Sequence, residues 1–285
     1  MIDTFRPSSL EEALEIRASR RAVPFAGGTD LMVKLRRGAG VLPGFEHPVL
    51  FLDRCAELAV LRDDGAALEI GAMVTLARLA ADPLVPGPLA EVARSMAGPG
   101  IRSVATVGGN VCNASPAADL LPFLYSHNAR VRLISRSTRR TLPVEEFVRG
   151  PGATEVGPDE LLAALIVPGW SPTVSFWRKA GTRRANALTK VSLFACADTD
   201  GAVVHRARLA LGAVAPTVVR LREVERMLEG AAVADLGAVA RRALDACAAA
   251  VRPIDDQRST ADYRRTAACG LVEHFIARGL GGRRA

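Results

Sequence analysis

The sequence predicts an α+β protein of two domains, and three observations lead to this expectation. At 285 residues the chain is long enough to form two separate hydrophobic cores. Its first part mixes short strand-like and helical segments, whereas from residue 174 onwards three strand-like runs are followed by helical ones. Between the two parts, residues 169–173 are rich in Gly, Pro and Ser, which is typical of a domain boundary.

The first elements follow from cap residues and apolar spacing. Apolar residues recur at helical spacing after Ser8, which forms a capping box with Glu11, so we expect a helix over residues 8–19. Residues 21–25 and 49–52 are short and apolar, as in strands. Similar patterns then predict a hairpin at 58–71, helices at 75–81, 88–96 and 119–126, a hairpin at 130–143 and an apolar segment at 159–167.

The second part has the pattern of a small sheet covered by helices, which is an α+β arrangement. An Asp200-Gly201 turn joins the last two of its three strand-like runs. The strands are expected at residues 174–179, 188–197 and 203–213, and the helices at 218–228, 235–250 and 262–277.

Composition places the chain among soluble globular proteins, with 49% hydrophobic and 24% charged residues. No apolar run approaches 18 residues and the N-terminus has no basic stretch before an apolar one, so we expect neither a membrane span nor a secretory signal. The five cysteines form no CxxC pair and no zinc or iron–sulfur spacing. This pattern favours reduced thiols in a cytoplasmic protein without a protein-bound metal.

The formal net charge of +7 raises the question of nucleic-acid binding. Only three of the basic residues are lysines, the arginines are scattered, and no aromatic residues alternate with them. Such a pattern argues against a nucleic-acid partner. A basic surface for an acidic partner protein stays open.

Two glycine segments are the most informative feature of the sequence. Adjacent glycines let backbone N–H groups approach an anion without a Cβ in the way. The first segment also lies between an expected strand and an expected helix, a favourable place for an anion, although a G-x-G-x-x-G fingerprint is absent. Together the segments suggest two loops around one long phosphate-bearing ligand, for which a dinucleotide is the candidate. They are Ala26-Gly27-Gly28-Thr29-Asp30 and Thr106-Val107-Gly108-Gly109-Asn110.

The second segment continues to Asp119 with many small and polar residues. Thr106 offers a hydroxyl, Asn110 an amide, and Asp119 a carboxylate for ribose or ribityl hydroxyls. Polar groups at this density are costly in a core unless they meet a ligand, and an elaborate structural loop is the alternative. Cys112 has no base near it in the sequence, so we interpret it as a packed thiol and not as a nucleophile.

The ordered set of motifs resembles the FAD-binding medium subunit of the molybdenum hydroxylase family, which includes xanthine dehydrogenase and carbon monoxide dehydrogenase. Residues 26–30 are similar to the family motif AGGxS or AGGTD, and residues 106–119 to TIGGNxxxxxPxxD. Each motif alone is weak, but the set is specific and covers nearly the whole chain. Further similar stretches lie at 144–147, 160–162, 210–217 and 262–265.

The resemblance implies a fold and a domain division. Residues 1–170 would form the two-subdomain FAD-binding unit of the vanillyl-alcohol-oxidase-like (PCMH-type) superfamily. Residues 174–285 would form a small α+β C-terminal domain with an antiparallel sheet and helices.

The resemblance also implies roles for single residues, all of them in cofactor binding. Ala26, Gly27, Gly28, Thr29 and Asp30 would contact the FAD pyrophosphate, and Thr106, Gly108, Gly109 and Asn110 would form the second phosphate and ribityl loop. Asp119 would bind FAD, and Leu162 would pack near the adenine or the flavin. Lys179 would lie near the isoalloxazine ring, with the adjacent Arg178 as the alternative. No catalytic residue and no metal ligand is implied.

The function implied is that of an oxidoreductase subunit that transfers electrons through FAD. A small partner with 2Fe–2S clusters would supply electrons, and a large partner would hold the molybdenum cofactor, in a dimer of heterotrimers. NAD, a quinone or another external acceptor would receive the electrons. The alternatives are a stand-alone flavin-dependent oxidoreductase of the same fold, or a basic non-enzymatic binding module.

Overall fold

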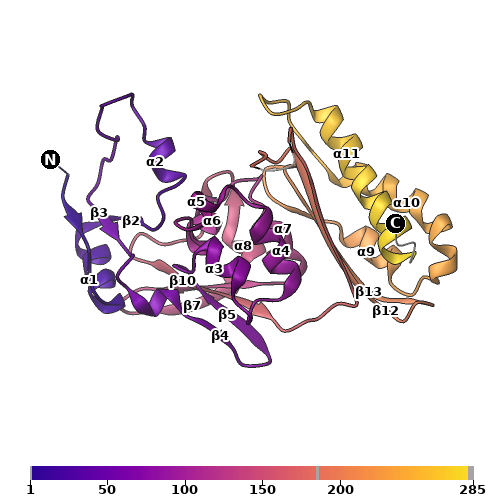
Figure 1. Cartoon of the computed structure of the whole chain (residues 1–285), viewed down its shortest axis with the longest axis horizontal. Coiled ribbons are helices and arrows are strands. Elements are labelled where there is room, and N and C mark those ends of the chain that lie inside the picture. Colours follow the sequence, from indigo (N-terminus) through magenta and orange to yellow (C-terminus); the bar gives the residue numbers. More distant parts are fainter. Residues whose placement is uncertain (1, 184–185, 282–285) are drawn as a thin grey trace.

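The computed structural model describes residues 2–183 and 186–281, so residues 184, 185 and 282–285 of the predicted C-terminal domain lie outside the described ranges. Three units follow one another from left to right in Figure 1. The leftmost is a three-stranded parallel sheet of order β1-β3-β2 with a helix beside it. Its elements are β1 (Thr4–Phe5), α1 (Leu10–Arg20), β2 (Val23–Phe25), α2 (Leu31–Lys34) and β3 (Val49–Phe51).

The middle unit is a five-stranded antiparallel sheet of order β4-β5-β10-β6-β7, with helices packed over it (Figure 1). Phe123 and Phe147 are completely buried between these helices and the sheet, so they anchor the core of this unit. The strands are β4 (Leu61–Asp63), β5 (Ala67–Gly71), β6 (Arg130–Ile134), β7 (Arg139–Pro143) and β10 (Leu161–Pro168). The other elements are η1 (Ala56–Ala59), α3 (Leu76–Ala81), α4 (Gly87–Ser95), α5 (Pro99–Arg102), α6 (Val107–Asn113), α7 (Leu120–Ser126), α8 (Val144–Phe147), β8 (Val148–Gly150) and β9 (Ala153–Thr154).

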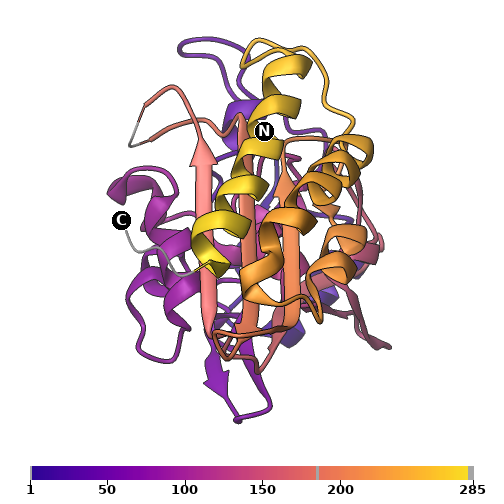
Figure 2. The same ribbon diagram turned by 90° about the vertical axis from the view of Figure 1, so that its right-hand side faces the viewer.

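The third unit is a four-stranded antiparallel sheet of order β11-β12-β13-β14 between two sets of helices. Figure 2 shows its own helices lying across the outer face, and α4 and α7 of the middle unit contact the inner face. Its elements are β11 (Val174–Ala180), β12 (Val191–Thr199), β13 (Val204–Gly212), β14 (Val219–Arg220), α9 (Arg222–Leu228), η2 (Val233–Asp235), α10 (Leu236–Ala250), α11 (Ala261–His274) and the π-helix η3 (Phe275–Leu280).

The alternation of β12 joins the second and third units. Leu193 and Ala195 belong to the core beneath α9–α11, whereas Phe194 and Cys196 belong to the core of the middle unit. All four are completely buried because successive strand residues point to opposite faces and both faces are covered. The two cores are therefore held together through this sheet.

Most predicted elements are present, but two predictions of local structure were wrong. Residues 106–110, predicted as a turn, are the capped start of helix α6. The helix predicted at 218–228 begins instead as strand β14, because the N–H of Leu221 donates to the carbonyl of Leu209 (2.9 Å) and holds this segment against β13. The helix itself starts only at Arg222.

Several element boundaries also differ from the predictions. The capping box lies one residue later than Ser8 and Glu11, because the Ser9 hydroxyl accepts from the Glu12 N–H (3.2 Å) and the Glu12 carboxylate accepts from the Ser8 N–H (2.8 Å). The expected hairpin at 58–71 starts at residue 61, after a short 3-10 helix. The strand expected from 188 starts at 191. Within the described ranges, no helix is long and apolar enough to cross a membrane.

Candidate functional site

Glycines of both segments lie very close to distant parts of the chain, Gly27 to the residues just before the second segment and Gly108 to Ala72. A Cβ on Gly27 would lie 2.7 Å from the carbonyl carbon of Val104 and still closer to its oxygen. A Cβ on Gly108 would lie 2.6 Å from the Cβ of Ala72. Both distances are shorter than any normal carbon–carbon contact. These glycines are therefore required for the close approach of segments that are far apart in the sequence.

The first segment exposes a run of free backbone donors. Gly28 has φ +67°, the left-handed conformation that glycine adopts without strain. Within the described part of the chain, the N–H groups of residues 27–30 donate to no protein acceptor, and the first donor after them is the N–H of Met32, which binds the Gly28 carbonyl (2.9 Å). Successive unpaired N–H groups around a left-handed residue form a concave anion site.

The second segment starts helix α6 with one polar atom left unpartnered. The Thr106 hydroxyl accepts from the Gly109 N–H (3.0 Å) and caps the helix. The side-chain oxygen of Asn110 is buried and makes no hydrogen bond among the described residues. A buried acceptor without a partner is unfavourable, so its place beside the free N–H groups indicates that a ligand supplies the missing donor.

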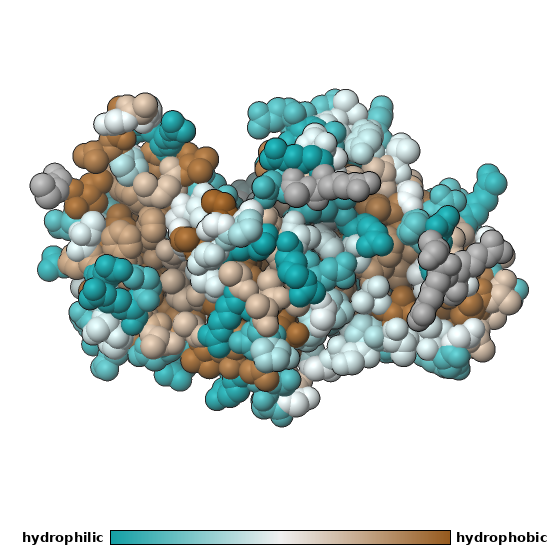
Figure 3. Space-filling view, viewed as in Figure 1, coloured by the Kyte–Doolittle hydropathy of each residue, from teal (hydrophilic) through white to brown (hydrophobic). Residues whose placement is uncertain are grey.

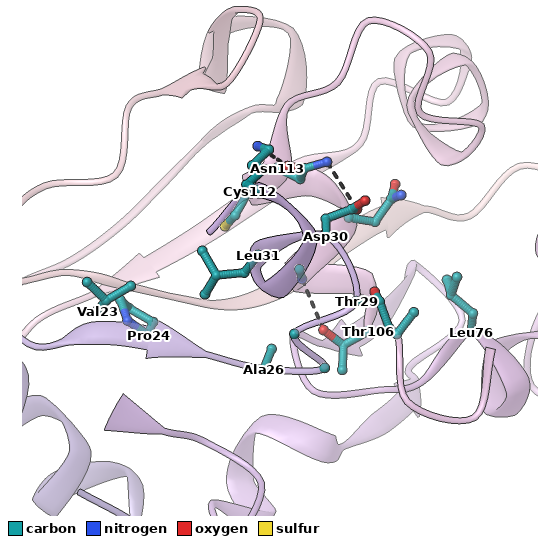
Figure 4. A pocket seen from close by; sticks show the side chains of 16 residues that line it. Val23, Pro24, Ala26, Thr29, Asp30, Leu31, Leu76, Thr106, Cys112 and Asn113 are labelled. Atoms are coloured by element: carbon teal, nitrogen blue, oxygen red, sulfur yellow. Dashed lines mark hydrogen bonds between the residues drawn. The ribbon is translucent and has the colours of Figure 1, made fainter. Parts of the chain in front are cut away.

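A cavity of about 260 Å³ lies between these two segments (Figure 4). Figure 3 shows that the surface is hollowed between the N-terminal unit and the middle of the molecule. In Figure 1, drawn from the same side, α2 and α6 lie in this region. Across the cavity, the Asn113 amide donates to Asp30 (3.1 Å), as the dashed line in Figure 4 marks, and the Asn113 oxygen accepts from the Lys34 ammonium (2.5 Å). Asp30 thus binds protein donors, and Lys34 brings a positive charge to the cavity wall.

A second cavity, of about 230 Å³, adjoins the first. Both are lined by Pro24, Ala26, Gly109 and Cys112, and the second extends to Leu162. Taken together, the two cavities have a volume in the range of roughly 300–1,000 Å³ that is typical of ligand sites. The arrangement fits an elongated ligand whose charged middle meets the free N–H groups.

Cys112 stands between the two cavities as a neutral thiol. Burial raises the pKa of its thiol to about 12, so the nucleophilic thiolate is absent at neutral pH. Its position in the shared wall makes it a packing residue of the site.

Asp119 and Lys179 form an ion pair away from both cavities. The Lys179 ammonium donates to Asp119 (2.7 Å) and to the carbonyl of Ser95 (2.8 Å), and the Thr189 hydroxyl donates to the other Asp119 oxygen (2.6 Å). The side chains of the pair are only 9% and 12% exposed. Removal of one partner from such a buried pair typically costs about 3–5 kcal/mol. The pair therefore ties strand β11 to the start of helix α7.

Arg178 points away from this pair. Its guanidinium donates to the carbonyl of Trp177 (2.9 Å) and lies 5.2 Å from the centre of the Phe176 ring, on the side of the C-terminal core. The alternation along β11 therefore directs Lys179, and not Arg178, toward the middle unit.

Most predicted site residues come together, and three contributors were missed. Gly108 and Leu162 line the second cavity, and Asp119 and Lys179 line neither. Lys34, four residues after Asp30 on the helix that follows the glycine turn, had a usable signal because it is one of only three lysines. Asn113 and Thr189 gave none, since their roles arise from contacts with distant residues. The predicted residues that line the first cavity are Ala26, Gly27, Gly28, Thr29, Asp30, Thr106, Gly109 and Asn110.

Comparison with known proteins extends this description to the whole chain. Residues 1–170 match the family model described as the FAD binding domain in molybdopterin dehydrogenase, and residues 177–278 match the CO dehydrogenase flavoprotein C-terminal domain. The chain is 30% identical over 234 residues to the xanthine dehydrogenase FAD-binding subunit of Escherichia coli, covering 79% of this chain and 78% of the relative. It is 29% identical over 279 residues to the carbon monoxide dehydrogenase medium chain of Hydrogenophaga pseudoflava, covering 95% and 94%.

A solved structure shares the fold. Carbon monoxide dehydrogenase from Hydrogenophaga pseudoflava, in a form that lacks the Mo-pyranopterin moiety of its cofactor, superposes with a TM-score of 0.88 at 26% identity, over 98% of this chain and 96% of the other. This likeness confirms the predicted fold class, a two-subdomain unit followed by a small α+β domain.

Proposed function

The chain belongs to the family of FAD-binding domains in molybdopterin dehydrogenases, and from that membership we propose that it passes electrons from 2Fe–2S clusters of one partner subunit to an external acceptor. It is the FAD-binding medium subunit of an oxidoreductase of the molybdenum hydroxylase type. The molybdenum cofactor and the iron–sulfur clusters would be held by a large and a small partner in a dimer of heterotrimers. NAD, a quinone or another acceptor would take up the electrons.

The first cavity fits the diphosphate of FAD. The unpaired N–H groups of residues 27–30 would bind its oxygens, with Lys34 adding positive charge nearby. Asn110 would gain a donor from the ligand for its buried oxygen. The glycines leave this cradle clear of side chains. The free N–H groups beside a buried unpartnered acceptor are the observation that supports the proposal most strongly.

Two further predicted residues would contact other parts of the cofactor: Leu162, which lines the second cavity, and Lys179, which lines neither cavity. Leu162 would pack on one end of the cofactor from the second cavity. Lys179, held by Asp119 and Ser95, would place its ammonium near the isoalloxazine ring and favour negative charge there. When bound, FAD supplies the two-electron chemistry, and these residues orient it and set its potential.

The relatives' names support the partner proposal, since each is called a subunit or a medium chain. Cys112 lines both cavities with a neutral thiol, which supports a packing role and not a nucleophilic one for this residue. From the family membership we propose that substrate chemistry occurs on another chain. We also propose a cytoplasmic location, which the five free cysteines support.

The experiment is purification of the tagged chain from its native host, followed by absorption spectroscopy and identification of bound subunits. We expect a flavin spectrum with one FAD per chain, together with a small iron–sulfur subunit and a large molybdenum subunit. A flavin-free protein would contradict cofactor binding. A flavin-loaded protein that oxidises a substrate without partners would instead identify a stand-alone oxidoreductase.

A further inference from the structure

A third cavity is larger than the one between the glycine segments. It has a volume of about 560 Å³ and lies where the middle unit meets the C-terminal one. Residues 115–117 and Pro151 form one wall, and residues 213, 215, 216, 252–254 and 256–258 with Arg264 form the other. The segment between α10 and α11, which supplies much of the second wall, runs along the top of the molecule in Figures 1 and 2.

Hydrogen bonds between backbone groups hold the walls together. The N–H of Ala213 donates to the carbonyl of Pro116 (2.8 Å), and the N–H of Arg252 donates to the carbonyl of Val214 (2.8 Å). Ala213 itself has a φ of +62°, which is uncommon for a residue other than glycine. The cavity is therefore fixed by main-chain contacts from both units, at a junction where ligand sites often occur.

Arg264 is buried in the cavity wall, and one of its N–H groups has no acceptor among the described residues. The residue is 5% exposed, and it donates to Asp256 (2.6 Å) and to the carbonyl of Ala213 (3.2 Å). Its Nε is buried and has no acceptor among the described residues. A buried guanidinium with an unpaired N–H is unfavourable unless an acceptor from a ligand completes it.

Two further arginines line the same cavity. The Arg258 guanidinium makes no hydrogen bond or ion pair within residues 2–183 and 186–281, and only its backbone N–H is engaged, on Asp256 (2.8 Å). Arg252 donates to the carbonyls of Ala249 and Val251. With Asp256 as the one acidic residue of the lining, the cavity carries a formal excess of two positive charges.

We propose that this cavity binds a small organic anion, one that carries a phosphate or carboxylate group on an apolar body. Arg258 and the free Nε of Arg264 would bind the anionic oxygens, since guanidinium groups match both oxyanions. The remaining lining, which would contact the apolar body, consists largely of Pro116, Ala117, Pro151, Ala213, Ala215, Pro216, Pro253 and Ile254. The site is separate from the flavin cavities and does not depend on the proposed electron transfer.

The test is calorimetric titration of the FAD-loaded full-length chain with phenyl phosphate and with inorganic phosphate at low salt. FAD saturation keeps both probes out of the first cavity. We expect one phenyl phosphate per chain, and weaker binding of inorganic phosphate because it lacks the apolar body. Arg258→Gln should weaken phenyl phosphate binding by about tenfold or more. Arg265→Gln, next to Arg264 on α11 but outside the cavity lining, should leave phenyl phosphate binding unchanged.

The variant Arg258→Gln keeps the test decisive even where a change at the buried Arg264 prevents folding. Equal phenyl phosphate affinity in Arg258→Gln and the native chain would overturn the proposal, as would no binding at millimolar concentration. Equal binding of inorganic phosphate would contradict the apolar part of the site. Because flavin absorbance is followed in the same samples, a failure here is distinguishable from a failure to bind FAD.

Discussion

Replacing Gly27 by alanine tests whether the close approach of the two glycine segments forms the cofactor site. The new Cβ would lie 2.7 Å from the carbonyl carbon of Val104 and 3.0 Å from the Cα of Ala105. Since carbon atoms prefer about 3.5–4.0 Å, one segment must retreat by about 0.8 Å or more. Overpacking of this kind costs about 1–3 kcal/mol. If this cost destabilises only the FAD-bound form, the affinity for FAD falls by roughly 5- to 150-fold.

The assay is a fluorescence titration of the FAD-free protein with FAD, together with thermal unfolding of the free and loaded forms. Gly27→Ala should raise the Kd for FAD and reduce the stabilisation by FAD, which follows from its affinity. Gly237→Ala is the matched control, because a Cβ at this position of α10 meets no atom within 4 Å. An unchanged Kd and an unchanged Tm in Gly27→Ala would refute the reasoning.

Three further predictions follow from single side chains. Asn110→Ala should weaken FAD binding by about tenfold in the same titration. The FAD-free protein should stay about as stable, because the side-chain oxygen that is removed has no partner in that form. A loss of stability without a loss of affinity would contradict this prediction. Burial lowers the pKa of His127 to about 4, so its contribution to stability is present above pH 6.5 and is lost as pH falls toward 4. Urea unfolding should show about 2 kcal/mol of this loss between pH 7.5 and pH 5, and His127→Gln should remove that part of the slope. Lys179→Gln should make the reduction potential of the flavin more negative by roughly 30 mV or more in a dye-equilibrated titration. Arg178→Gln should leave this potential unchanged. Equal shifts in both variants would contradict the assignment of Lys179.

Much of the architecture can be predicted from the sequence because it depends on local patterns. The hairpin at 130–143 and the helix capped by Thr75 form as predicted, since alternation, turn residues and caps act over a few neighbours. The segment at 218–228 shows the limit. Its helical spacing is real, but a hydrogen bond to Leu209 in another strand decides its first residues.

The residues of the site likewise include some that a local sequence pattern predicts and some that act only through distant contacts. Gly27 and Gly28 were found because a Gly-Gly pair after a strand is a local pattern, although only Gly28 has the left-handed φ that requires glycine for a local reason. Asn113 and Thr189 act through partners about 70 to 80 residues away, so no sequence pattern reveals them. The partnership of Asp119 with Lys179 likewise depends on how the third unit packs on the second.

The measurement that tests the account most directly is an experimental structure of the FAD-loaded chain. We predict the diphosphate of FAD within hydrogen-bonding distance of the N–H groups of residues 27–30, with a ligand donor on the side-chain oxygen of Asn110 and the cofactor extending past Leu162. FAD bound elsewhere, for example in the 560 Å³ cavity beside Arg264, would contradict the assignment of the glycine segments.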